Sequence, residues 1–334
     1  MIRVARLALG ALCLTAPAEA QRTALTGTIL VTNKTPATVT LVDAASGAML
    51  ATLPTGAGPH EIVMLPDART AVVTDYGAQM PGHTLTVIDV PSLRVVRTID
   101  LGGYRRPHGI VALSNGRQVA VTSETEKAVL LVNVADGTIA RAVSTAKLGS
   151  HMVGVVRDDT RGWTGDIGSN TITELDLVGG NALRSIDVPL QPEAINVTPD
   201  GREVWVGSNA TGRVSVVNTA SGAVTTAAEG FGWPYRVLFT PDDAMVLLPD
   251  YRKEELRFVD RTTKAEVARL AFPGGGPQGI TLANDGRVAL LSLSSEGTVA
   301  LIDVAGRRES ARLPVGDTPD GVAYTPHVVR APTR

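Results

Sequence analysis

A short cluster of residues recurs seven times along the chain at a nearly constant interval. Its copies have a Pro-x-Gly-like form: Pro59-His60-Glu61, Pro107-His108-Gly109, Ser150-His151-Met152, Pro192-Glu193-Ala194, Pro234-Tyr235-Arg236, Pro277-Gln278-Gly279 and Pro319-Asp320-Gly321. Successive copies are 48, 43, 42, 42, 43 and 42 residues apart. One four-stranded blade of a β-propeller takes about 40 to 45 residues. The interval therefore predicts seven such blades.

Each interval carries the strand and turn signals of one blade. In the repeat that begins at Pro192, β-type runs at 195–197, 203–207, 214–217 and 224–227 are separated by turn sequences such as Pro199-Asp200-Gly201. The first repeat, 28–53, lacks an innermost strand, and the C-terminal segment 321–324 is an innermost strand with nothing after it. We therefore expect an all-β, seven-bladed propeller of four-stranded antiparallel blades. Pairing of the C-terminal innermost strand with the N-terminal three-strand group closes the ring and removes exposed sheet edges.

The first twenty residues have the form of an export signal. Two arginines precede an apolar run at 7–15, and Ala18-Glu19-Ala20 resembles a cleavage site. We expect a cleaved signal peptide at 1–20, the propeller at 21–324 and a C-terminal tail at 325–334, in a periplasmic or secreted protein. The apolar run is shorter than the roughly 20 residues that span a bilayer. No transmembrane segment is expected after cleavage.

Composition excludes several classes of function. The single cysteine, Cys13, lies in the predicted signal, so the mature chain has no disulfide, no cysteine metal ligand and no cysteine nucleophile. A net charge of -2 and an aromatic content of 4% argue against general nucleic-acid binding. We expect a monomer whose partner is a small-molecule ligand or an envelope protein.

A second motif lies at the end of the second strand of several blades. It reads Val31-Thr32-Asn33, Val73-Thr74-Asp75 and Val121-Thr122-Ser123. With the Pro199-Asp200-Gly201 turn, these residues resemble the YVTN-repeat or YncE-like seven-bladed propellers of bacterial envelopes, over about residues 24–324. The tyrosine of that signature is absent at all three places. The resemblance implies the fold and an envelope location, but members of a fold differ in activity, so it assigns no reaction.

The repeat also predicts where a functional site lies. Because innermost strands surround the central channel, the residue after each Pro, or after Ser150, should lie at the channel mouth. This ring reads His60, His108, His151, Glu193, Tyr235, Gln278 and Asp320. Neutral imidazoles beside a carboxylate can coordinate a divalent ion such as Zn, Cu, Mn or Fe and leave a position open. The predicted metal ligands are His60, His108, His151 and Glu193; alternatively, the histidines only hydrogen-bond neighbouring loops.

The same ring could act without a metal. His108 or Glu193 would be the general base, Tyr235 a proton donor, and Arg236 a group that holds a substrate carboxylate or phosphate. An enzyme of this kind would be a lyase or lactone hydrolase acting at the channel mouth, as on several seven-bladed propellers that the chain resembles. A non-catalytic scaffold or protein-interaction propeller of the cell envelope is the other alternative.

A further group of residues is expected on the same face as the ring. Most of its members follow second strands, and we treat them as possible ligand contacts: Asp75, Tyr76, His83, Arg106, Asp166, Asp250, Tyr251, Arg252, and the ring members Gln278 and Asp320. His83 stands in an extended segment, 77–83, which the repeat places as a long loop beside the funnel.

Overall fold

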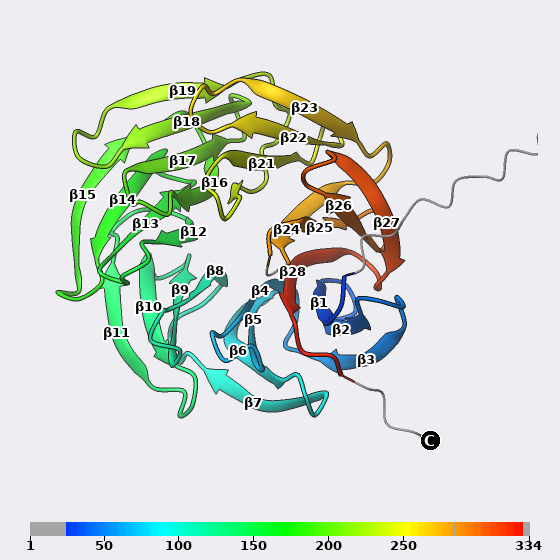
Figure 1. Ribbon diagram of the computed structural model, residues 1–334. Coiled ribbons are helices and arrows are strands. Elements are labelled where there is room, and N and C mark those ends of the chain that lie inside the picture. The colour runs from blue at the N-terminus through cyan, green and yellow to red at the C-terminus, as the bar shows by residue number, and fades with distance from the viewer. Residues whose placement is uncertain (1–24, 284, 330–334) are drawn as a thin grey trace, which may run out of the picture.

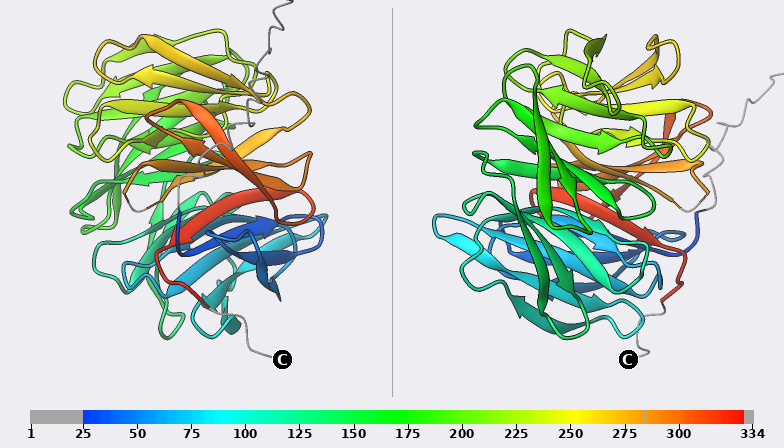
Figure 2. Two further views of the ribbon diagram at one scale, coloured as in Figure 1. Left: turned by 45° about the vertical axis from the view of Figure 1, so that its right-hand side comes forward. Right: turned by 90° about the vertical axis from the view of Figure 1, so that its left-hand side faces the viewer.

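Seven four-stranded antiparallel sheets are arranged in a ring in the computed structural model, which describes residues 25–283 and 285–329 (Figures 1 and 2). This confirms the predicted fold class. The predicted signal peptide at 1–20 lies outside the described residues. Among the described residues, no helix has the length and apolar character that crossing a membrane requires.

The strands of the first four blades follow the predicted order, written here from the channel outward. Blade 1 is β28 (Pro319–Thr325), β1 (Thr28–Asn33), β2 (Thr38–Asp43) and β3 (Met49–Pro54). Blade 2 is β4 (Pro59–Met64), β5 (Thr70–Gly77), β6 (Pro81–Asp89) and β7 (Arg94–Asp100). Blade 3 is β8 (Pro107–Ala112), β9 (Gln118–Ser123), β10 (Ala128–Asn133) and β11 (Ile139–Ser144). Blade 4 is β12 (Ser150–Val155), β13 (Arg161–Asp166), β14 (Thr171–Asp176) and β15 (Asn181–Asp187).

The last three blades follow the same order, with one shortened strand. Blade 5 is β16 (Pro192–Val197), β17 (Glu203–Ser208), β18 (Arg213–Asn218) and β19 (Val224–Ala228). Blade 6 is β20 (Leu238–Phe239), β21 (Met245–Asp250), β22 (Glu255–Asp260) and β23 (Glu266–Ala271). Blade 7 is β24 (Pro277–Leu282), β25 (Val288–Leu293), β26 (Thr298–Asp303) and β27 (Arg308–Pro314). In blade 6 only a single bridge, Pro234 to Asp250, precedes the two-residue β20.

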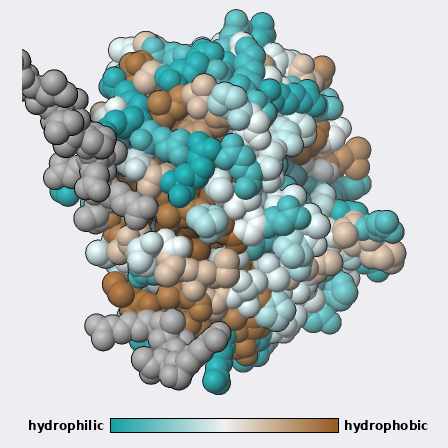
Figure 3. Space-filling view, turned by 90° about the vertical axis from the view of Figure 1, so that its right-hand side faces the viewer, coloured by the Kyte–Doolittle hydropathy of each residue, from teal (hydrophilic) through white to brown (hydrophobic). Residues whose placement is uncertain are grey.

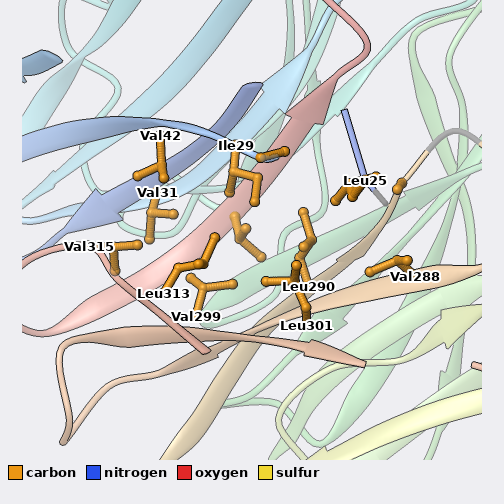
Figure 4. Packing of buried hydrophobic residues seen from close by; sticks show 13 residues of the cluster. Leu25, Ile29, Val31, Val42, Val288, Leu290, Val299, Leu301, Leu313 and Val315 are labelled. Carbon is orange, nitrogen blue, oxygen red and sulfur yellow. The ribbon is translucent and has the colours of Figure 1, made fainter. Parts of the chain in front are cut away.

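The two ends of the described chain close the ring. β28 pairs with β1 in antiparallel register, with Ala323 opposite Leu30. The Thr28 hydroxyl donates a hydrogen bond of 2.7 Å to the His327 carbonyl. Behind this pair, side chains of blades 1 and 7 form one buried cluster that includes Ile29, Val31, Val42, Leu290, Val299 and Leu301 (Figure 4). Closure therefore combines strand pairing with a dry seam between blades.

Neighbouring innermost strands are joined by hydroxyl groups of the Val-Thr-Asn-like motif. Thr32 in blade 1 donates to the His60 carbonyl of blade 2 at 2.9 Å, and Thr122 in blade 3 donates to the His151 carbonyl of blade 4 at 2.7 Å. Both hydroxyls belong to fully buried residues. The repeated threonine thus holds the backbone of a ring histidine in the next blade.

Glycine at the third position of the cluster permits a close approach of the strands. A Cβ built at Gly109 would lie 2.7 Å from the Cα of Met152 in the next blade, and one built at Gly321 would lie 2.4 Å from the His60 carbonyl oxygen. Such contacts are shorter than van der Waals packing allows. At Gly109 and Gly321, therefore, a larger residue would force the neighbouring innermost strands to shift.

The outer strands face solvent and show the pattern expected of an edge. Residues of β7, β15 and β23 are mostly exposed or half-buried, whereas the second and third strands are almost fully buried. Seen from the side of β27 and β3, the surface is a mosaic of hydrophilic and hydrophobic residues, with the hydrophobic ones gathered lower on that face (Figure 3). The core therefore lies between the blades rather than outside them.

The hydroxyl contact between blades can be tested at Thr122. We expect Thr122→Val to lower the free energy of unfolding by about 1–3 kcal/mol. Valine has nearly the same size as threonine, but it gives the buried His151 carbonyl no donor and the Gly109 amide no acceptor. Urea unfolding followed by tryptophan fluorescence measures this change. Thr125→Val, at an exposed position of the following turn, is the matched control and should change stability by less than about 0.5 kcal/mol. Equal effects of the two substitutions would contradict the assignment.

Candidate functional site

The ring residues reach the channel through an irregularity at the start of each innermost strand. The first Pro pairs with the end of the second strand, and the register then shifts, as between Pro59 and Ile62 or between Pro107 and Ile110. A bulge of this kind re-aims a side chain. Because proline cannot donate a ladder hydrogen bond, it is tolerated at this first position. The cluster thus begins the strand rather than forming a separate loop before it.

A cavity of about 360 Å³ opens at this end of the channel. Six of the seven predicted ring residues line it, together with three neighbours: His60, His108, His151, Glu193, Tyr235, Gln278, Lys34, Trp233 and Tyr251. The seventh, Asp320, is completely buried behind it and contacts Lys34 and Tyr235. The structure therefore brings together side chains from all seven blades around one cavity.

The three ring histidines are in mutual contact. The ring centroids of His60 and His108 are 5.0 Å apart, and those of His108 and His151 are 3.6 Å apart with the rings tilted by 32°. Tyr76 meets His108 edge-on at 5.3 Å and lies 4.5 Å from His60. The sequence-based prediction that the imidazoles share one location is consistent with this geometry.

Hydrogen bonds orient the two outer imidazoles. His60 Nδ1 donates to the Gly58 carbonyl at 2.8 Å. His151 Nδ1 donates to the Glu124 carboxylate, which also accepts the Tyr76 hydroxyl at 2.7 Å. With Nδ1 occupied as a donor, the lone pair of each neutral ring is on Nε2.

His108 differs from its two neighbours. It is 2% exposed, and its Nδ1 has no hydrogen-bond partner among the described residues. Burial lowers the pKa of His108 well below its usual value, and the nearby imidazoles and Arg236 act in the same direction. Burial also lowers the pKa of His60, against the opposing attraction of Asp320. These two rings are therefore neutral at pH 7.

Glu193 is held next to the imidazoles by two hydrogen-bond donors and by the nearby guanidinium of Arg236. Its Oε2 accepts from Asn209 Nδ2 and from Trp233 Nε1, the latter at 2.9 Å. Its Oε1 lies 3.8 Å from His151 Nε2 and 3.9 Å from Arg236. One carboxylate oxygen is thus fixed while the other faces the histidine cluster.

The opposite wall of the cavity is a second charged group. Lys34 Nζ lies 3.3 Å from Asp320 and donates to Gln278 Oε1 at 3.0 Å. Burial disfavours the Asp320 carboxylate, but Lys34 and other cations outweigh this and lower its pKa. The Tyr235 hydroxyl donates to Asp320 at 3.2 Å, and burial raises the pKa of Tyr235 well above its usual value. Tyr235 therefore keeps its proton.

Arg236 is buried against the cavity wall and is not among the residues that line the cavity. Its guanidinium forms an ion pair with Glu61 and donates to the Tyr235 carbonyl at 2.6 Å. Burial raises the pKa of Glu61, although Arg236 opposes this. Arg236 thus neutralises a buried carboxylate, and its predicted contact with a substrate remains a prediction.

Three aspartates of the second predicted group bind within their own blades. Asp75 accepts from Thr84 and Thr86, and burial raises its pKa to about 6. Asp166 accepts from four hydroxyl groups, those of Ser150, Thr164, Thr171 and Thr173. Asp250 accepts from the backbone amides of residues 232, 233 and 253. Each fixes the end of a second strand, so a structural role accounts for its burial.

The remaining members of that group divide by position. Tyr251 lines the cavity and packs against Trp233, over which Arg252 lies at 4.7 Å. Arg106 lies over the Tyr76 ring at the same distance. The predicted loop at 77–83 is instead a hairpin extension, because β5 continues to Gly77 and β6 begins at Pro81. His83 is half exposed there and faces Asp100 at 3.9 Å, and no contact joins it to the described ring histidines.

Within residues 25–283 and 285–329, no group of three or more His, Cys, Asp or Glu side chains is disposed, as it stands, to hold a metal ion. The rings of His108 and His151 lie with their centroids 3.6 Å apart and their planes tilted by 32°. A metal held by the predicted ligands would therefore require side chains of this cluster to move from the positions described.

Three residues of the site were not among the predicted candidates. Lys34 and Glu124 each follow a second strand directly, and Glu61 follows His60 where three other copies of the cluster have glycine. A signal for them existed in the departures from the repeat, because charged residues at positions that face the channel need a partner. Their pairing with residues of other blades is visible only in the folded chain.

Comparisons with known proteins identify the fold alone. No family model matches the chain, and no curated protein sequence matches it. Hydrazine synthase from Kuenenia stuttgartiensis aligns with a TM-score of 0.72 at 19% identity, over 84% of this chain and 93% of that one. A functionally unknown protein from Desulfotomaculum acetoxidans aligns with a TM-score of 0.72 at 11% identity, over 90% and 99%. Dihydro-heme d1 dehydrogenase NirN in complex with DHE aligns with a TM-score of 0.63 at 17% identity, over 92% and 78%.

The neutral state of the buried imidazoles predicts a pH dependence of stability. Because the folded-state pKa values of His60 and His108 lie below the unfolded value, the unfolded chain binds protons first as pH falls. We expect each of these two histidines to contribute a decrease in the free energy of unfolding below about pH 6.5, by up to about 1.4 kcal/mol per pH unit. Asp75, whose pKa burial raises to about 6, contributes with the opposite sign below pH 6, so the contribution of His108 is obtained as the difference between native protein and variant. Urea unfolding between pH 5 and 8 measures this slope. His108→Gln should reduce it and His83→Gln should leave it unchanged; the same slope in all three proteins would refute the assignment.

Proposed function

We propose that this protein binds a small ligand in the cavity at the top of its channel, and that its imidazoles contact that ligand. The observation that carries the proposal is the meeting of three histidines from consecutive blades around a cavity of about 360 Å³. A cavity of this size suits a small molecule. Blade folding alone requires no imidazole at these positions, since glutamate, tyrosine, glutamine and aspartate occupy the equivalent places in other blades.

The arrangement around His151 favours direct acid–base chemistry on the ligand. A carboxylate that accepts from Nδ1 holds an imidazole in one tautomer and supports its protonation at Nε2. Glu124 occupies that place, and burial of its carboxylate is outweighed by the His151 hydrogen bond, which lowers its pKa. His151 Nε2 would take a proton from the ligand, and Lys34 would hold a negative group across the cavity. A lyase or a lactone hydrolase needs such a base.

A divalent metal ion is the second candidate, favoured by the fixed tautomers of two rings. Histidines that ligate metals commonly donate their other nitrogen to a carbonyl or carboxylate. His60 and His151 do so through Gly58 and Glu124. His60, His108, His151 and Glu193 would then hold Zn, Cu, Mn or Fe after a rotation of one stacked ring. The ion would supply a Lewis acid at the channel mouth.

The setting we propose is the bacterial cell envelope. It rests on the export-signal pattern of residues 1–20 and on the likeness of the repeats to YVTN-type propellers. NirN, a dihydro-heme d1 dehydrogenase solved with DHE, has the same fold at 17% identity. That likeness agrees with ligand binding by such a propeller and leaves the ligand of this chain to experiment.

Metal titration separates the two candidates. Untagged mature protein, stripped with a chelator, is titrated with Zn²⁺ by calorimetry. The metal candidate predicts about one bound ion, with affinity reduced about 100-fold or more by His60→Ala, His108→Ala or His151→Ala. His83→Ala, a histidine outside the cavity, is the control and should bind as the native protein does. If Zn²⁺ does not bind saturably, the metal candidate is eliminated, and direct acid–base chemistry by the imidazoles is left.

The base candidate is tested by the protonation pattern of His151. In the native protein we expect nitrogen NMR to show His151 protonated at Nδ1, because Glu124 accepts that proton. Glu124→Ala removes the acceptor, so it should abolish this preference and raise the exchange rate of the Nδ1 proton. Glu126→Ala, in the same segment but bonded to Ser123 and the Arg105 amide, is the matched control. An unchanged His151 tautomer in Glu124→Ala would remove the dyad.

A further inference from the structure

Blade 6 departs from the repeat where it borders the histidine cavity. Its innermost strand has only two residues, and a single bridge joins Pro234 to Asp250 before that strand begins. In the other six blades the residue before the Pro or Ser of the cluster has a positive φ, between 51° and 67°: Gly58, Arg106, Gly149, Gln191, Gly276 and Thr318. Trp233 occupies this position in blade 6, and its φ is not positive. The chain therefore approaches the cavity by a different path in this blade.

Buried polar groups hold this path in place. Arg257 donates to the carbonyls of residues 229 and 230 at 3.0 and 2.6 Å, and its guanidinium lies 3.8 Å from the centre of the Phe231 ring. Asp250 accepts from the amides of residues 232 and 233 at 2.7 and 2.8 Å. Both charged groups are buried. The backbone that carries Trp233 is thus fixed, and its indole N–H is fixed by Glu193 of blade 5.

Three aromatic side chains of blade 6 form one wall of the cavity. Trp233, Tyr235 and Tyr251 all line it. The ring centroid of Trp233 lies 5.6 Å from that of Tyr251 and 6.5 Å from that of Tyr235, and the two tyrosine rings are 6.2 Å apart. Trp233 and Tyr251 are half-buried, so part of each side chain is open to a ligand. Aromatic surfaces of this kind pack well against another flat ring.

Unpaired hydrogen-bond acceptors lie on the other side of the cavity. Because His60 Nδ1 donates to a carbonyl, the lone pair of the neutral ring is on Nε2. That nitrogen has no hydrogen-bond partner in the part of the chain that the structure describes, and it is not sealed from solvent as His108 Nδ1 is. The same holds for Glu193 Oε1, which lies 3.8 Å from His151 and 3.9 Å from Arg236. A ligand that contacts these two atoms has to donate hydrogen bonds.

Unused donors lie in the same cavity. Lys34 contacts Asp320 and Gln278 Oε1, which leaves one of its three ammonium hydrogens. The Gln278 amide nitrogen and the Tyr251 hydroxyl have no partner within residues 25–283 and 285–329, and both are open to solvent. A ligand therefore meets donors and acceptors together. A hydroxyl group satisfies both kinds, whereas a carboxylate only accepts and an ammonium only donates.

The cations around the cavity argue against a positively charged ligand. A cation binds best over the face of an aromatic ring. Arg236 already lies over the Tyr235 ring at 4.2 Å, and Arg252 lies over the Trp233 ring at 4.7 Å. The protein's own guanidinium groups thus occupy a face of two of the three rings. An uncharged ligand fits this wall better.

We propose that the cavity binds an uncharged aromatic ring that carries hydroxyl groups. The ring packs against Trp233 and Tyr251, while its hydroxyls donate to His60 Nε2 and Glu193 Oε1 and accept from Gln278 or Lys34. A cavity of about 150 Å³ holds one benzene ring, so the cavity of about 360 Å³ has room for a ring with substituents. This proposal rests on the proposed function, because it names the class of ligand for the same cavity.

Nitrogen NMR of the histidines tests this ligand class on the native protein. The chain has five histidines, and His60→Gln identifies the His60 signals. The probes, added without oxygen to chelator-treated protein, are catechol, 1,2-dimethoxybenzene, cis-1,2-cyclohexanediol and benzoate. We expect catechol to move the His60 Nε2 signal saturably upfield, because that lone pair accepts a hydrogen bond, and to leave the His83 signals in place. The other probes lack the donors, the aromatic ring or the neutral charge, and should bind at least about 10-fold more weakly.

Paired substitutions test the aromatic wall. Tyr251→Leu should weaken catechol binding about 10-fold, whereas Tyr251→Phe, which keeps the ring, should stay within about 2-fold of the native protein. Tyr104→Leu removes a half-buried tyrosine that does not line the cavity, and it should leave the affinity unchanged. Circular dichroism shows whether each variant is folded. The comparison of probes on the native protein does not depend on these variants.

Several results would overturn the ligand class. They are absence of a saturable catechol shift, equal binding of 1,2-dimethoxybenzene or cis-1,2-cyclohexanediol, tighter binding of benzoate, and native catechol affinity in folded Tyr251→Leu. The proposed function stands if any of the other probes moves the signals of the ring histidines. If no probe moves them, the proposed function is overturned as well only when Zn²⁺ also leaves them in place.

Discussion

The close contact between neighbouring innermost strands is the constraint on which the rest of this structure depends. A glycine removes the side chain that would separate the strands, and a buried hydroxyl of the preceding blade holds the backbone of the next. Because both contacts involve the residues of the repeated cluster, they fix the ring residues as well as the blades. The His60 and His151 carbonyls are bound on the strand side, so their side chains turn to the channel. The backbone atoms that hold neighbouring blades together therefore also position the side chains of the site.

The second governing effect is the removal of water from charged groups at the channel mouth. Burying an unpaired charge is costly, whereas a neutral imidazole can be buried at much lower cost. The cavity follows this rule: Glu61 pairs with Arg236, Asp320 pairs with Lys34, and the histidines cluster without a cation between them. The result is a cavity in which imidazole side chains lie beside the charged groups of Lys34 and Glu193. Such a surface is suited to accept protons or to ligate.

Departures from the repeat give single blades side chains that the other copies of a position lack. Most copies of a position do the same structural task, as Asp75 and Asp166 do at the ends of their second strands. Glu61 stands where three other copies of the cluster have glycine, and Arg236, at the same position in blade 6, pairs with it. The other copies of such a position show which structural contact it normally makes. A copy with a different side chain can therefore be recognised by the contact that it lacks or adds. The seven blades of one chain thus show which side chains the fold requires and which belong to a single blade.

Periodicity in the sequence was enough to determine the blade count, the strand order and the closure by the C-terminal strand. It also placed six of the seven ring residues at one cavity, with Asp320 buried behind it. These features follow from the repeat because, in a closed ring of equal blades, residues at the same position of each repeat lie at the same height and distance from the channel. Which of these side chains pair was decided only by the tertiary structure. The Glu124–His151 contact, the Glu61–Arg236 pair and the extension of the hairpin that carries His83 depend on side chains from different blades or on local strand length. The energy of each ion pair or hydrogen bond depends on how far apart the two groups lie and how much water they have lost. Both quantities are set only when the ring closes.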